Sequence, residues 1–78
     1  MTKKIIHGYE VEYDEGSDIL KAYLEHLEIR LSHEEFKAIF ESAFRSDLRK
    51  THLEDKYGNK FTLVYKGENS CLLRKREI

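Results

Sequence analysis

The chain has 78 residues, of which 40% are hydrophobic and 37% are charged, with a formal net charge of −1. This length suits one domain, and the composition is too apolar for a disordered segment and too charged for a membrane protein. The N-terminal stretch MTKKIIHGYEVEY lacks the apolar core of a signal peptide. The single cysteine also excludes an internal disulfide, so we expect a cytoplasmic protein.

The first predicted element is extended and covers Lys3–Tyr13. After residue 8, two tyrosines and a valine alternate with two glutamates, which is the period of a half-buried strand. Gly8 marks either a bulge in one strand or a tight turn that divides the segment into a hairpin.

A helix is predicted to follow, with Ser17 or Asp18 as its N-cap. Four leucines then recur at helical spacing: Leu20, Leu24, Leu27 and Leu31. The segment Glu28–Leu31 fits either the end of this helix or a short strand between two helices.

The motif SHEE predicts the start of a second helix at His33. Ser32 is followed three residues later by Glu35, which is the pattern of a capping box. Apolar residues then recur on one helical face: Phe36, Ile39, Phe40, Ala43 and Phe44, with Leu48 if the helix runs on. We interpret this stripe as part of the core rather than as a docking face for a partner helix.

From Thr51 onward the hydrophobic period changes to two. Three strands are predicted, at about Thr51–Tyr57, Lys60–Lys66 and Cys71–Arg76. Gly58-Asn59 is predicted to be a two-residue type II′ turn between the first two. The resulting order, β-α-α-β-β-β, predicts a single α+β domain over residues 1–78. Its two helices pack on one face of an antiparallel sheet of about four strands.

The predicted strand Lys60–Lys66 separates its residues between two faces. One face is assigned to the core: Phe61, Leu63 and Tyr65. The other face is predicted to meet water: Lys60, Thr62, Val64 and Lys66. The two-residue turn would place Lys56 opposite Phe61, beside the core, so a bulge or a different register stays open.

Charge is distributed unevenly along the chain. Residues 1–41 contain five Lys/Arg and ten Asp/Glu, a balance of −5, and residues 42–78 contain nine and five, a balance of +4. The predicted outer face supplies a candidate binding surface: Lys60 and Lys66, extended by Lys75 or by Arg74 and Arg76, depending on a register that the sequence does not fix. The carboxylates of the first half leave open an acidic patch for a basic partner.

These features favour a small non-enzymatic protein-binding or regulatory module that acts through charge complementarity. Its partner is expected to be another protein or a second copy of itself. The alternative is a nucleic-acid-binding module that uses the same basic surface. The strand aromatics Phe61 and Tyr65 are expected in the core, which weighs against base stacking.

The sequence contains no recognisable catalytic, metal or cofactor signature. The four histidines have no metal-ligand spacing such as HxxxH: His7, His26, His33 and His52. Cys71 lies in a predicted strand, where a cysteine is usually a small core residue. We therefore predict no enzymatic activity, cofactor, metal, membrane association or small-molecule substrate.

Overall fold

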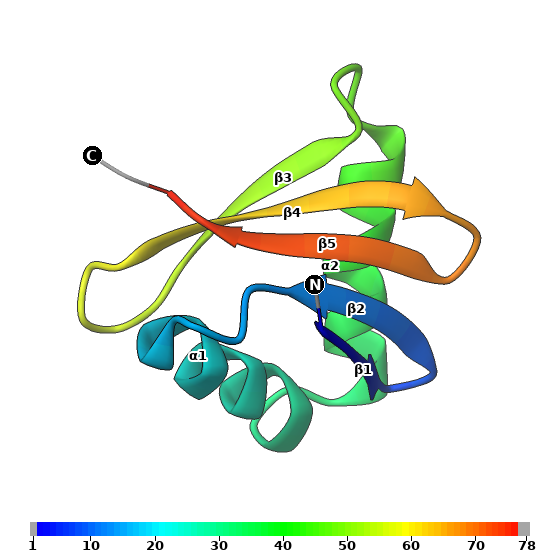
Figure 1. Ribbon diagram of the computed structural model, residues 1–78. Helices are drawn as coiled ribbons and strands as arrows, with labels where there is room; N and C mark the ends of the chain where they lie inside the picture. The colour runs from blue at the N-terminus through cyan, green and yellow to red at the C-terminus, as the bar shows by residue number, and fades with distance from the viewer. Residues whose placement is uncertain (1, 77–78) are drawn as a thin grey trace.

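The computed structural model describes residues 2–76 of the chain. Its elements are β1 (Thr2–Ile6), β2 (Tyr9–Tyr13), α1 (Asp18–Ile29), α2 (His33–Arg45), β3 (Lys50–Glu54), β4 (Lys60–Gly67) and β5 (Ser70–Lys75). The strands form one sheet in the order β1-β2-β5-β4-β3 (Figure 1). Both helices contribute to the core on one face of this sheet, so the predicted α+β fold is confirmed.

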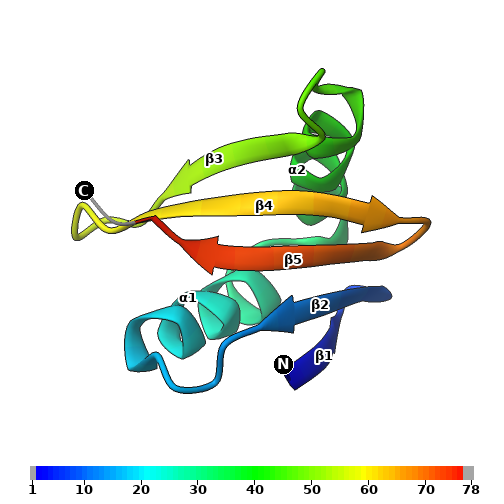
Figure 2. The ribbon, with the colours of Figure 1, turned by 45° about the horizontal axis from the view of Figure 1, so that its top comes forward.

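The first predicted strand is a hairpin, which gives the described sheet five strands. His7 and Gly8 have φ angles of 52° and 87°, as a two-residue type I′ turn requires. This turn places Ile6 opposite Tyr9. Gly8 therefore belongs to a tight turn between two strands and not to a bulge within one strand. β2 also pairs with β5 in parallel, so the sheet is mixed and mostly antiparallel (Figure 2).

Both helices begin at the residues that local signals predicted. Ser17 caps α1 through its side chain, and α1 continues to residue 29 with Arg30 as its C-cap, so Glu28–Leu31 contains the end of this helix and not a strand. Ser32 and Glu35 form the predicted capping box, with hydrogen bonds of 3.0 and 3.2 Å. These bonds satisfy backbone N–H groups that have no partner within the helix. Within residues 2–76, neither helix is long and apolar enough to cross a membrane.

The capping box should contribute measurably to stability. We expect Ser32→Ala to lower the free energy of unfolding by about 1 kcal/mol, because one N-terminal N–H of α2 loses its acceptor. Urea denaturation followed by circular dichroism measures this loss. Glu25→Ala, at an exposed position inside α1, is the control and should change stability by less than about 0.5 kcal/mol. Equal losses in the two variants would contradict the capping role.

The core fills the space between the helices and the inner face of the sheet. Its buried members come from the helices and four of the strands: Ile6, Tyr9, Val11, Leu20, Tyr23, Leu24, Leu27, Phe36, Phe40, Ala43, Phe61, Leu63, Cys71 and Leu73. The predicted inner face of β4 is confirmed, with Tyr65 packed at its margin. The phenylalanine stripe of α2 is core only in part, because Phe44 is 45% exposed. Leu48 lies beyond the helix and is 72% exposed.

The predicted two-residue turn at Gly58-Asn59 is wrong. Leu53 lies opposite Phe61, and Glu54 lies opposite Lys60. The connection between β3 and β4 is therefore longer and runs from residue 55 to residue 59. The observed register removes the conflict that the short turn created, because an apolar residue now faces the core and Glu54 lies on the outer face.

Asp55 explains why the longer loop is stable. Its carboxylate accepts hydrogen bonds from the backbone N–H of Tyr57 at 2.9 Å and of Asn59 at 2.8 Å. It also accepts one from Asn59 Nδ2 at 3.0 Å. Burial raises the pKa of Asp55, but these hydrogen bonds outweigh it and leave the pKa below its ordinary value. The side chain thus replaces the backbone bonding of a tight turn.

Candidate binding surfaces

The outer face of the sheet is the face opposite the helices, and its half near β1 and β2 is electrically balanced. Lys3 Nζ lies 3.2 Å from Glu10 and 3.8 Å from Glu12. Lys66 Nζ lies 2.9 Å from Glu12 and donates a hydrogen bond to it. This hydrogen bond is the largest influence that lowers the pKa of Glu12. The cations of this half therefore have anionic neighbours within the same protein.

Cations outnumber carboxylates at the other end of β4 and β5, where Glu54 lies opposite Lys60. A shallow depression of about 300 Å³ lies there, lined by Lys50, Thr62, Val64, Arg74, Lys75 and Arg76. Lys60 is adjacent, because its carbonyl oxygen accepts a 2.7 Å hydrogen bond from the backbone N–H of Arg76. We call the five cations the basic patch: Lys50, Lys60, Arg74, Lys75 and Arg76. No ion pair joins any of them to a carboxylate within residues 2–76.

Of the five residues predicted as a binding surface, Arg74 lies opposite Thr62 on the outer face, and Lys60 and Arg76 are joined beside it. Lys75 also lines the depression, but it lies opposite Phe61, so its side chain leaves β5 on the inner side at the end of the sheet.

Lys66 does not belong to the patch, because it lies at the opposite end of β4 and is paired with Glu12. Sequence reasoning missed Lys50, which the β3–β4 register places opposite Val64 on the outer face. Charged and less polar residues alternate along β3, which indicates two faces. Only the register with β4 shows that Lys50 lies on the outer one.

The surface between these cations is polar and aliphatic. Thr62 points to the outer face as predicted, but it is only 8% exposed because longer neighbours flank it. These neighbours are His52 on β3 and Arg74 on β5. The phenylalanines and tyrosines of the described strands all lie in the core or pack against it. The basic patch therefore offers positive charge and hydrogen-bond donors without Phe or Tyr rings.

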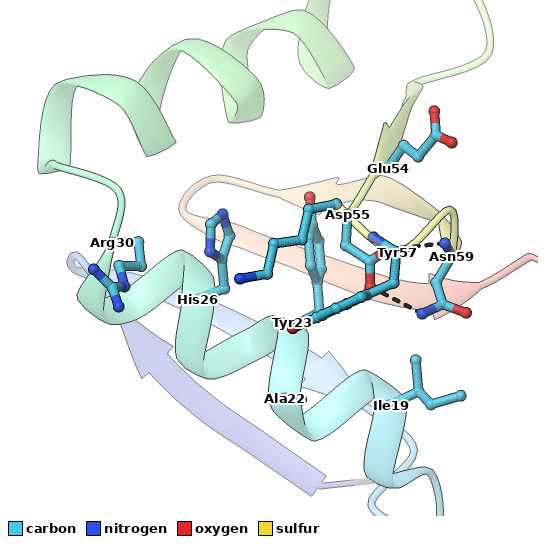
Figure 3. A pocket seen from close by; sticks show the side chains of 10 residues that line it. Ile19, Ala22, Tyr23, His26, Arg30, Glu54, Asp55, Tyr57 and Asn59 are labelled. Atoms are coloured by element: carbon cyan, nitrogen blue, oxygen red, sulfur yellow. Dashed lines mark hydrogen bonds between the residues drawn. The ribbon is translucent and has the colours of Figure 1, made fainter.

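A larger, open cleft of about 740 Å³ lies between α1 and the loop that follows β3 (Figure 3). Tyr23 forms part of its wall and stacks on Phe61 with 4.1 Å between ring centres. Tyr57 projects from the loop and is 77% exposed. Figure 3 shows Glu54 directed away from the other labelled side chains, and the Asp55 carboxylate is bonded within its own loop. The cleft thus combines aromatic and aliphatic surface with the cations Arg30 and Lys56.

The arrangement of the possible metal ligands and the position of the single cysteine bear on metal and thiol chemistry. No group of three or more His, Cys, Asp or Glu side chains within residues 2–76 is arranged to hold a metal ion. Cys71 lies on the inner face of β5 and is 0% exposed. Burial, with a smaller contribution from the charge of Glu12, raises the pKa of its thiol to about 12. Such a thiol stays protonated at neutral pH and is a poor nucleophile.

The buried thiol leads to a direct test with iodoacetamide. We expect Cys71 in the folded protein to react at about pH 8 far more slowly than in urea, because reaction requires opening of the core. The pKa of the Cys71 thiol in the folded protein lies above the ordinary thiol value of about 8.5. Above that pH the unfolded chain releases the proton more readily than the folded protein, so the free energy of unfolding should fall as pH rises.

Mass spectrometry measures the labelling rate of Cys71. Native labelling as fast as that of the unfolded chain would contradict the position of Cys71.

Comparison with known proteins gives no match: no protein-family model, no curated protein and no solved structure matches the chain. The class that fold and surface define is a small α+β domain with an open, partly basic sheet face. Function has to be inferred from the chemistry of that face.

Proposed function

We propose that this protein is a small, non-enzymatic binding module of the cytoplasm that docks an acidic surface of a protein partner on the basic patch. The supporting observation is an asymmetry on the outer face. Lys3 and Lys66 are paired with neighbouring glutamates. The cations of the basic patch form no ion pair among the described residues, although Glu54 lies opposite Lys60 on the same face. Clustered, unneutralised charge attracts an oppositely charged partner and speeds its association.

A protein partner is favoured over nucleic acid by the chemistry of the patch. Sheet proteins that bind single strands stack bases on exposed aromatic rings, and the described strands keep their Phe and Tyr rings on the core side. Binding to a duplex relies on cations that follow the phosphate backbone. Here the cations gather at one end of a domain about 27 × 25 × 24 Å in extent, and the net charge of −1 gives no overall attraction to phosphates.

Capture from a lysate of the source cells tests this function. Three immobilised proteins are compared: the wild type, Arg74→Glu/Arg76→Glu, and the control Lys37→Glu/Arg45→Glu. The control cations lie on α2 and contact Glu41, so the net charge changes equally away from the patch. After nuclease treatment, we expect the wild type and the control to retain the same protein and the patch variant to lose it.

Two other results would overturn the proposal. If only nucleic acid is retained from an untreated lysate and the patch variant loses it, the nucleic-acid alternative is supported. If all three proteins behave alike, the basic patch is not the binding surface.

A further inference from the structure

One edge of the sheet is formed by β3, which pairs with β4 on one side only. Figure 2 shows β3 as the outermost strand, with no further strand beyond it among the described residues. An open edge presents unpaired backbone N–H and C=O groups that can bind another strand.

The hydrogen bonds around β3 identify which backbone groups are free. Arg49 and Asp55 flank the strand and bond toward β4, through Tyr65 N at 2.7 Å and Asn59 O at 3.0 Å. Successive residues of a strand direct their backbone groups to alternate sides, so odd-numbered residues of β3 face β4. The backbone groups that point away from the sheet belong to Lys50, His52 and Glu54.

The sequence of β3, KTHLE, is complementary to itself in antiparallel orientation. When two copies pair about His52, Lys50 of each copy lies opposite Glu54 of the other, on the outer face. On the inner face, Thr51 lies opposite Leu53. Opposite charges directly across a strand pair stabilise it, and like charges destabilise it. The three residues with free backbone groups also face one another, as hydrogen-bonded antiparallel pairs require.

We propose that the protein forms a symmetric dimer in which β3 pairs with β3 of a second copy. Each β3 strand supplies one lysine and one glutamate, so two copies form two identical ion pairs. This reciprocal complementarity favours a second copy over an unrelated strand. We call the contact between the two β3 strands the seam. Antiparallel pairing also brings Leu48 of one copy and Tyr57 of the other to the same end of the seam. Both are unusually exposed for apolar residues, at 72% and 77%.

The dimer has a consequence for the outer face. A twofold axis perpendicular to the joined sheet keeps both outer faces on the same side, so the two basic patches flank the seam. A partner with two acidic segments could then bind both patches, with a gain in affinity from the second contact. The dimer itself does not depend on what the basic patch binds.

Charge exchange at the seam tests the proposed register by sedimentation over a range of concentrations. Glu54→Lys places two lysines opposite each other at each end, and Lys50→Glu places two glutamates there. Each single variant should weaken self-association by about tenfold or more. An equal mixture of the two variants should associate again, because every glutamate then faces a lysine. Lys21→Glu, on the exposed side of α1, should have no effect.

Amide hydrogen exchange locates the seam independently. In the wild type, the amides of Lys50, His52 and Glu54 should exchange more slowly at high than at low protein concentration, and in Glu54→Lys they should not. A wild type that stays monomeric at millimolar concentration would overturn the proposal. A dimer that neither single variant weakens would also overturn it. Glu54→Lys removes none of the five cations of the basic patch, although it changes the residue opposite Lys60. Partner capture by this variant therefore separates failure of the dimer from failure of the proposed function.

Discussion

Phe61→Ala is expected to lower the free energy of unfolding by about 3–5 kcal/mol. Phe61 is 0% exposed, and its ring lies parallel to that of Tyr23 on α1, with an interplanar angle of 4°. Truncation removes this stacking contact and leaves a cavity between β4 and α1. A domain of this size has a total stability of about 4–12 kcal/mol, so the variant should lose a large share of it. Urea denaturation followed by circular dichroism measures the difference.

Phe44→Ala is the matched control for this core substitution. Phe44 is 45% exposed and contacts Tyr65 at 5.0 Å between ring centres, with the Arg49 guanidinium over its ring. Because much of its surface is already in water, truncation should cost only about 1 kcal/mol. If both variants lost the same stability, the core would not be centred on β4 and the helices as described.

The second large effect is expected in binding. In Arg74→Glu/Arg76→Glu, two of the five cations of the basic patch become anions, so its charge falls from +5 to +1. The affinity for the captured acidic partner should fall about 100-fold at about 50 mM salt, mainly through slower association. The difference should shrink at about 300 mM salt, because salt screens exposed charges. Surface plasmon resonance with the purified partner measures both rates.

The folding of this variant provides its control. Both arginines are exposed and form no ion pair within the described residues, so the midpoint of thermal unfolding should stay nearly unchanged. Weaker binding with an unchanged midpoint assigns the loss to the surface. Unchanged affinity at low salt would show that the partner binds elsewhere.

Local signals in the sequence were sufficient for the helices. Ser32 and Glu35 are only three residues apart, and their reciprocal bonds depend on little beyond that segment. The strand faces of β4 were also predictable, since Phe61 and Leu63 follow the simple alternation of a half-buried strand.

Long-range pairing was beyond sequence reasoning. The register of β3 depends on the Asp55 side chain, whose three hydrogen bonds favour a longer loop than Gly58-Asn59 alone suggested. The parallel pairing of β2 with β5 joins segments far apart in the chain. It also brings Glu12 near Lys66, and this contact removed Lys66 from the candidate surface. The same dependence on register concealed Lys50.

The most direct test of the basic patch is an amide chemical-shift titration of the nitrogen-15-labelled protein with a short polyglutamate peptide at low salt. We expect the largest shifts at the patch residues and at Thr62 between them, and little change at Lys37 and Arg45, which already have Glu41 as a partner. The shifts should disappear in Arg74→Glu/Arg76→Glu and weaken as salt is added. Shifts concentrated on α2, or none at low salt, would contradict the basic patch as the binding surface.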